Sequence, residues 1–205
     1  MIAIIDYGAG NLRSVQKACE YNGASAIITS DKNKIESASR VILPGVGAFG
    51  DCMESIKNYN LYDCIHKVCE NGTPFLGICL GLQLLFEKSE ESPKADGLAI
   101  FKGKNIKIPK KDGLKIPHMG WNSLNFEKEA PLFKGVENGS FVYFVHSFYM
   151  CPEDKSIISA TCNYSENLPV ALSYNNINAV QFHPEKSGST GLKMLKNFID
   201  FGGDI

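Results

Sequence analysis

The chain has 205 residues, a formal net charge of −1 and a charged fraction of 21%. This length predicts a single domain over residues 1–205 with a sizeable core, and the balanced charge argues against nucleic acid as a partner. No apolar run approaches the roughly 20 residues that a membrane-spanning helix needs, and the first residues lack the basic start of a signal peptide. The seven cysteines are scattered and odd in number, which favours a reduced, cytoplasmic protein over a disulfide framework.

The first part of the sequence alternates between short apolar runs and amphipathic stretches. The runs predict strands over residues 2–5, 25–29, 41–43 and 73–77. The amphipathic stretches predict helices over residues 12–21, 31–39, 52–57, 61–71 and 80–87. Asn11 and Asp31 are the candidate N-caps of the first two helices. This alternation predicts an α/β fold, with an open, mostly parallel sheet and helices on both faces.

The alternation of strand and helix patterns ends after residue 87. A polar loop over residues 88–96 precedes short apolar runs that glycine and proline interrupt, at 98–101, 106–108, 123–126, 141–144, 156–162 and 170–174. These runs predict antiparallel strands added to the parallel sheet. The segment 117–122, PHMGWN, is expected to be a loop whose Trp121 is a candidate for a partner surface. A last strand at 179–182 and a helix at 192–201 complete the prediction.

Two glycine-rich turns follow predicted strands. Residues 8–11 read GAGN, but Arg13 stands where a dinucleotide-binding motif needs its third glycine, so a tight βα turn is preferred over a cofactor site. The second turn, PGVGAFG at 44–50, lies at the sheet edge where α/β proteins bind ligands. Its backbone N–H groups suit a phosphate or an oxyanion. From these residues alone both roles stay open, as does that of a plain loop.

Cys79 lies in the sequence GICLG, between a predicted strand and a predicted helix. A cysteine in this position is the sulfur counterpart of the serine nucleophile elbow. Gly77 and Gly81 leave room for neighbouring backbone, and N–H groups at the start of the helix favour a thiolate. The N–H of Leu80 would face an oxyanion formed when the sulfur attacks a carbonyl. The competing interpretation is an ordinary buried cysteine.

The triplet His183-Pro184-Glu185 follows the last predicted strand. Residues i and i+2 of an extended segment point the same way, so His183 and Glu185 are expected on one side. A carboxylate beside an imidazole fixes its tautomer and raises its basicity. Taken singly, the two residues also fit a structural histidine and a solvated surface charge. With Cys79 they form a nucleophile, base and orienting group.

These motifs resemble a known family over essentially the whole chain. GICLGLQ and HPE are similar to class I glutamine amidotransferases of the triad type. IIDYGAGNLRSV, LPGVGAFGD, PHMGWN, FVHSFY and QFHPEKSG resemble, within that class, the glutaminase subunits of imidazole glycerol phosphate synthase. The resemblance implies that Cys79 attacks the side-chain amide of glutamine, that His183 moves the proton and that Glu185 orients the imidazole. Ammonia then leaves, and a thioester is hydrolysed to glutamate.

The resemblance also implies roles for residues around the triad. The oxyanion hole would combine the N–H of Leu80 with an N–H from the 45–47 loop, that of Val46 or Gly47. Glutamine would be held by Gly45, by Gln83 and by the backbone of Ser147 and Phe148. Phe148 stands where the family often has tyrosine, so no hydroxyl acts there. Neither a cofactor nor a metal is implied.

The family's partner is a (β/α)8 cyclase subunit, bound as a heterodimer. It uses the ammonia to make imidazole glycerol phosphate and an aminoimidazole carboxamide ribotide in histidine biosynthesis. The implied interface includes Trp121, Asn122, Tyr143 and Lys186, and the 44–47 loop would rearrange when the cyclase is loaded. Three alternatives remain: a glutaminase for a different synthase, as in surface-sugar biosynthesis; a cysteine hydrolase for peptides or γ-glutamyl chains; and a non-catalytic binding module.

Overall fold

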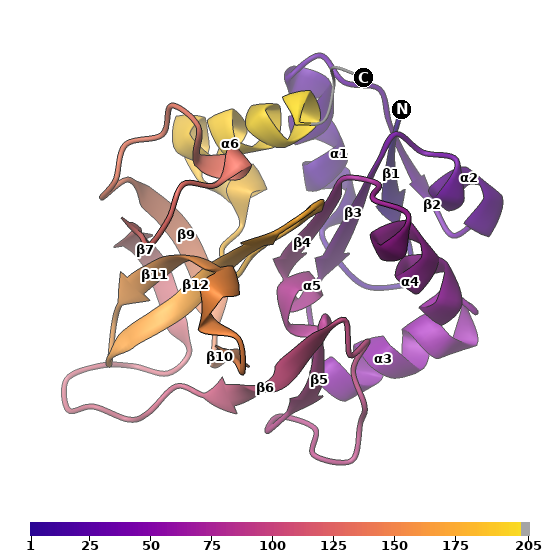
Figure 1. Cartoon of the computed structure of the whole chain (residues 1–205). Coiled ribbons are helices and arrows are strands. Elements are labelled where there is room, and N and C mark those ends of the chain that lie inside the picture. Colours follow the sequence, from indigo (N-terminus) through magenta and orange to yellow (C-terminus); the bar gives the residue numbers. More distant parts are fainter. Residues whose placement is uncertain (202–205) are drawn as a thin grey trace.

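The computed structural model describes residues 1–201 and is organised around an eight-stranded sheet (Figure 1). Its strands are β1 (Ile2–Ile5), β2 (Ala26–Thr29), β3 (Arg40–Gly45), β4 (Phe75–Cys79), β8 (Asn125–Phe126), β11 (Ile158–Asn163), β12 (Asn167–Tyr174) and β13 (Ile177–Val180). They lie in the order β2-β1-β3-β4-β13-β12-β11-β8. Neighbours from β2 to β13 are parallel and the remaining pairs are antiparallel. The predicted fold class is therefore confirmed.

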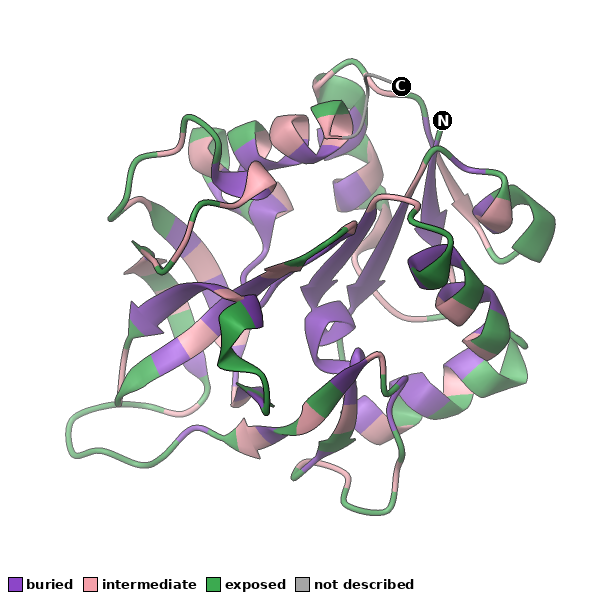
Figure 2. Cartoon of the chain, viewed as in Figure 1, coloured by how far each residue is buried: buried purple, intermediate pink, exposed green. Residues whose placement is uncertain are grey.

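Helices cover both faces of the parallel part of the sheet. One face packs against α1 (Leu12–Tyr21) and α6 (Gly188–Asp200), and the other against α2 (Lys32–Glu36), α3 (Phe49–Asn58) and α4 (Tyr62–Glu70). Side chains alternate between the two layers, so that Ile4 packs on the α1 side and Ile5 on the α3 side. Because both faces are covered, β1, β3 and β4 are buried almost throughout (Figure 2).

The two candidate N-caps behave differently. Asp31 has an extended backbone, and its side chain accepts a hydrogen bond from the N–H of Asn33 at 2.9 Å, so its prediction is confirmed. Asn11 has φ −87° and ψ 58°, outside the extended region typical of an N-cap, and its side chain makes no capping hydrogen bond. Asn11 does hold the N-cap position of α1, since its main-chain oxygen accepts a hydrogen bond from the N–H of Val15 at 3.2 Å, but its side chain does not cap the helix.

The helix predicted over 80–87 is a single turn. The structure has α5 (Leu80–Gln83), after which β5 (Phe86–Ser89) pairs with β6 (Phe101–Lys107). The main-chain carbonyl of Leu85 accepts hydrogen bonds from Ile100 and Phe101, so pairing with a later segment overrides the local helical pattern. β6 replaces the two short strands predicted at 98–101 and 106–108, and β10 (Phe148–Pro152), which was not predicted, completes a sheet with order β10-β6-β5.

The segment 117–122 is a strand and not the predicted loop. β7 (His118–Ser123) pairs antiparallel with β9 (Phe141–His146), with Trp121 opposite Tyr143. Its glycine and its inward-facing polar residues conceal the alternation that usually identifies a strand. Side chains at alternate positions face opposite sides, so His118 and Asn122 lie on the inner face of this two-stranded sheet while Trp121 lies on the outer face.

Candidate active site

Three neighbouring parallel strands bring the candidate catalytic residues to one edge. Gly45 at the end of β3 lies in register with Cys79 at the end of β4, and Val180 of β13 lies in register with Ile78 of β4. His183 follows β13 by three residues. Because the carboxyl ends of parallel strands meet, segments that are distant in the sequence come together above this edge.

The turn at Cys79 is as sharp as the motif predicts. Cys79 has φ +56° and ψ −112°, a left-handed conformation that is uncommon for a residue other than glycine and that stores strain. A Cβ atom at Gly81 would lie 1.9 Å from the main-chain oxygen of Leu43, and one at Gly77 would lie 3.0 Å from that of Gly81. The expectation that the two glycines admit neighbouring backbone is confirmed.

His183 and Glu185 form a buried pair. Nδ1 of His183 lies 2.8 Å from Oε1 of Glu185, and the two side chains are only 3% and 1% exposed. Burial opposes a charge on His183, but interactions with the side chains of Cys79 and Glu185 outweigh it and raise the pKa of His183 to about 9. Since Nδ1–H donates to the carboxylate, Nε2 is the atom left to exchange a proton with a thiol. Within residues 1–201, this Nε2 has no hydrogen-bond partner of normal geometry.

A cavity of about 310 Å³ opens above these residues. It is lined by eight of the candidate site residues: Val46, Gly47, Cys79, Leu80, Gln83, Ser147, Phe148 and His183. Gly45 and Glu185 do not line it, because they lie beside Cys79 and behind His183. Glu91, Pro117, Val145 and His146 line it as well, and sequence reasoning did not single them out. Pro117 belongs to the motif PHMGWN, and Val145 and His146 belong to FVHSFY, so of these four only Glu91 lay outside every motif.

Two polar side chains in the cavity are fixed by hydrogen bonds. Gln83 donates from Nε2 to the main-chain oxygen of Phe148 at 3.0 Å and to Oε1 of Gln181 at 2.9 Å. Both N–H donors of Gln83 are then used, so what it offers a ligand is its side-chain oxygen. Oε2 of Glu91 accepts from the N–H of Phe49 at 2.8 Å. The second oxygen of this carboxylate suits an ammonium group.

The end of β3 and the loop that follows it each have one carbonyl group that accepts a side-chain hydrogen bond. The Tyr7 hydroxyl donates to the main-chain oxygen of Pro44 at 2.8 Å, and the Cys52 thiol lies 3.5 Å from that of Val46. A trans peptide directs C=O and the following N–H to opposite sides, so the N–H of Gly47 points away from Cys52. Gly47 itself has φ +105°, and no atom lies within 4 Å of the place where a Cβ would stand, so neighbouring groups do not crowd the loop there.

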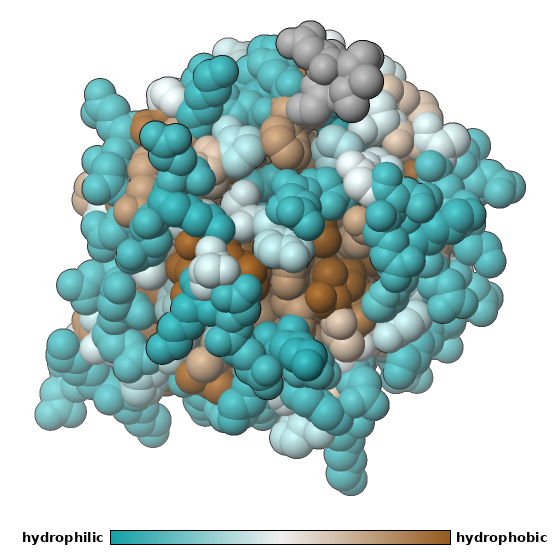
Figure 3. Space-filling view, viewed as in Figure 1, coloured by the Kyte–Doolittle hydropathy of each residue, from teal (hydrophilic) through white to brown (hydrophobic). Residues whose placement is uncertain are grey.

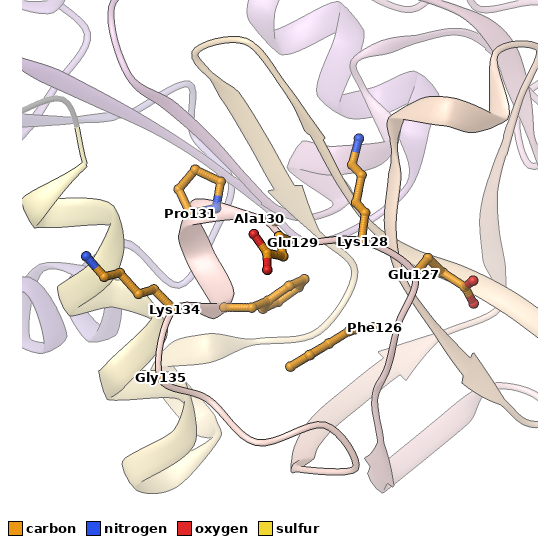
Figure 4. Close-up of a pocket in the computed structure, with 9 residues that line it drawn as sticks. Phe126, Glu127, Lys128, Glu129, Ala130, Pro131, Lys134 and Gly135 are labelled. Carbon is orange, nitrogen blue, oxygen red and sulfur yellow. The ribbon is translucent and has the colours of Figure 1, made fainter.

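A second hollow, of about 740 Å³, lies beside β8 and η1 (Pro131–Phe133) (Figure 4). Phe126 and Phe133 line it, and their stacked rings have centroids 4.4 Å apart and planes inclined by 8°. Its lining has no cysteine or histidine, and Nζ of Lys128 is taken by the main-chain oxygens of Ser156 and Ser173. The face of the molecule seen in Figure 3 is mostly hydrophilic, with apolar side chains gathered near its centre. The smaller cavity is thus the one with reactive groups.

The candidate interface residues lie outside the cavity and divide between two faces. The rings of Trp121 and Tyr143 meet edge to face at 6.1 Å on the outer face of β7 and β9, beside the exposed Met119 and Phe141. Lys186 is exposed on η3 (Pro184–Lys186). Asn122 faces the other way, and its side chain donates to the main-chain oxygen of Asn163 at 3.0 Å.

The family model described as glutamine amidotransferase class-I matches residues 3–201. The chain therefore belongs to the class-I glutamine amidotransferases. Solved structures agree on the fold. A "glutamine amidotransferase" has a TM-score of 0.76 at 18% identity, covering 99% of this chain and all of that one. The PurLQS structure from Thermotoga maritima has a TM-score of 0.77 at 21% identity, covering 98% and 97%.

Curated relatives narrow the class to one family. The chain is 51% identical to imidazole glycerol phosphate synthase subunit HisH 1 of Methanococcus maripaludis, covering 98% of this chain and 99% of that protein. It is 52% identical to the HisH subunit of Caldanaerobacter subterraneus, covering 97% of each, and 50% identical to that of Aquifex aeolicus, covering 95% and 94%. Within the class, the chain belongs to the HisH family.

Proposed function

We propose that this chain is one glutaminase domain, the HisH subunit of an imidazole glycerol phosphate synthase in histidine biosynthesis. It hydrolyses glutamine to glutamate and ammonia and passes the ammonia to a cyclase subunit. The observation that carries the proposal is that Cys79, at a strained elbow, and His183 line the same cavity, with the buried Glu185 paired to His183 from behind.

In the proposed reaction, Nε2 of His183 holds the proton that comes from the Cys79 thiol, and the sulfur attacks the amide carbon of glutamine. The N–H of Leu80 and an N–H of Val46 or Gly47 stabilise the oxyanion that forms. The imidazolium returns its proton to the departing nitrogen, and ammonia leaves behind a thioester on Cys79. Water, deprotonated by His183, then attacks the thioester and releases glutamate. Glu185 holds the imidazole throughout.

The remaining groups of the cavity suit an amino acid. The free oxygen of Glu91 would pair with the α-ammonium group of glutamine, and Oε1 of Gln83 would accept a second hydrogen bond from it. Ser147 and Phe148 also line the cavity. Gly45 supports this arrangement indirectly, because a side chain there would collide with the Tyr7 hydroxyl and the backbone of Gly81.

The partner in this proposal is a (β/α)8 cyclase that docks on the outer face of β7 and β9. Val145 supports this placement, because it belongs to that face and also lines the cavity, so ammonia would travel a short distance. The main-chain oxygen of Tyr143 also accepts a hydrogen bond from the N–H of His183 at 3.0 Å. We place the complex in the reducing cytoplasm, in keeping with seven free thiols. No helix within residues 1–201 is long and apolar enough to cross a bilayer.

Reconstitution tests the proposal. Glutamine hydrolysis is measured for the chain alone, with the histidine-pathway cyclase, and with the cyclase plus its nucleotide ligand. We expect slow, intermediate and fast turnover, in that order. A glutamine-like electrophile should label Cys79 and spare the other six cysteines. No glutamine hydrolysis in any mixture, or uniform labelling, would refute the glutaminase assignment. Hydrolysis without any response to this cyclase would favour a different synthase as the partner.

A further inference from the structure

Two histidines outside the triad form a buried pair behind one wall of the cavity. Nδ1 of His118 lies 2.9 Å from Nε2 of His146. His146 lines the cavity and His118 does not. The His118 ring is held between Phe144, at 4.7 Å, and Tyr164, at 4.0 Å, both nearly parallel to it. Neither histidine has a role in the proposed reaction.

The partners of the two rings fix where the hydrogen atoms lie. A main-chain oxygen can only accept, so Nδ1 of His146 donates to that of Phe148, 3.0 Å away. Nε2 of a neutral His146 is then an acceptor, and Nδ1 of His118 must donate to it. Nε2 of His118 in turn accepts from Nδ2 of Asn122, at 3.3 Å. The hydrogen bonds therefore run in one direction, from Asn122 to Phe148.

Each imidazole must be neutral, because each ring needs one nitrogen that accepts a hydrogen bond and one that donates. Burial lowers the pKa of His118 to about 4. Burial lowers the pKa of His146 to about 3, against an opposing hydrogen bond to Phe148. At neutral pH each ring then carries a single N–H. The hydrogen bonds can be satisfied in only one way, with that N–H at Nδ1 of both rings.

The hydrogen-bond chain continues to the catalytic thiol. The main-chain oxygen of Phe148 also accepts from Nε2 of Gln83, which donates as well to Gln181. Nε2 of Gln181 lies 3.8 Å from the sulfur of Cys79. The carbonyl group of Phe148 thus accepts hydrogen bonds from two side chains. His146 fixes its position, and the carbonyl group in turn fixes the position of Gln83.

We propose that His118 and His146 are positioning residues for glutamine binding. They hold the Phe148 carbonyl, and through it Gln83, at a fixed place relative to strand β7. Since Met119 and Trp121 on the outer face belong to the same strand, a partner seated there acts on the glutamine pocket through this pair. The inference rests on the proposed glutaminase function and adds to it the residues that join the docking face to the pocket.

Packing alone does not account for the pair. A phenylalanine at position 118 would fill the same slot between two aromatic rings without burying polar atoms. Two imidazoles instead place four nitrogen atoms in the interior, which is tolerated only when each is hydrogen-bonded. Such a fully paired network specifies one arrangement of the groups that it joins.

The central experiment compares His118→Phe with the unmodified chain, each assembled with the cyclase. The substitution keeps the stacked ring and removes both hydrogen bonds. We expect kcat/KM for glutamine to fall about tenfold, mainly through KM, because the Phe148 carbonyl and Gln83 lose part of the support that fixes their positions. Synthesis from added ammonium should be unchanged, as should both activities of a control, His66→Phe on α4. An unaltered kcat/KM, or equal losses with glutamine and ammonium, would overturn the proposal.

Two further measurements make the test independent of one variant. In the unmodified protein, nitrogen NMR shifts should report the Nδ1–H tautomer for both His118 and His146; Nε2–H on either ring would overturn the proposal. Asn122→Ala should lower kcat/KM, and the double variant with His118→Phe should lose little more than either single variant, because one chain is broken in each. Additive losses would refute it. Should the unmodified chain hydrolyse no glutamine at all, the proposed function would fail and this inference with it.

Discussion

Two of the hollows formed by residues 1–201 make a useful comparison, because the larger of the two lacks the catalytic groups and the smaller contains them. The larger, of about 740 Å³, is built from one continuous stretch, residues 126–135, and gathers only local side chains. The smaller, of about 310 Å³, draws on the ends of β3, β4 and β13 and on the β9–β10 wall. Catalysis needs several groups to converge on one point, and convergence comes from the sheet and not from volume.

The largest loss of activity should come from Cys79→Ala, in the smaller cavity. Without the nucleophile, glutamine-dependent synthesis by the complex should fall by at least about a thousandfold. Synthesis from added ammonium should persist, because the cyclase then needs no glutaminase. Both rates are measured on the same reconstituted sample. Loss of the ammonium-dependent rate as well would mean that Cys79 supports the fold or the interface.

A smaller loss is expected from Gly47→Pro. Proline holds φ near −65°, whereas Gly47 has φ +105°, so the loop could not present its N–H groups to the oxyanion. Removing one such donor costs roughly a hundredfold in kcat. The comparison is Gly113→Pro, at another glycine with positive φ and open surroundings. Glutamine turnover that stayed the same in Gly47→Pro would remove the loop from the mechanism.

A change in the pKa of His183 is the next prediction for the smaller cavity. Burial acts to lower its pKa, and Cys79 is the first of the groups that raise it to about 9. In Cys79→Ala the raising interaction disappears while burial remains, so the pKa of His183 should fall. An NMR pH titration of the His183 imidazole in both proteins measures this. Titration at the same pH in both proteins would show that the thiol and the imidazole do not interact.

The smallest effect on activity is expected in the larger hollow. Phe126→Ala removes half of the stacked ring pair and should destabilise the protein by about 2 kcal/mol, less than for a fully buried ring. Glutamine and ammonium turnover should both stay at the level of the unmodified chain. Chemical denaturation and the two assays check this. A selective loss of glutamine turnover would mean that the larger hollow communicates with the site.

The sequence predicted those parts of the site that short motifs encode. Cys79 with its two glycines, and His183 with Glu185, are recognisable because a turn or an extended segment fixes their geometry locally. The contributions of Glu91 and His118 to the site were not predicted, because their positions depend on strand pairing between distant segments. The same cause explains the misassigned helix at 80–87 and the misassigned loop at 117–122. Local propensity was overridden there by partners that no short window contains.

The left-handed backbone at Cys79 also bears on how such a chain changes over evolutionary time. A side chain in that conformation costs roughly 1–2 kcal/mol that glycine would not. A copy released from its catalytic duty should therefore gain stability by drifting to glycine at this one position. Retention of any larger residue there, in a descendant of unknown activity, would be a sign that the chemistry is still under selection.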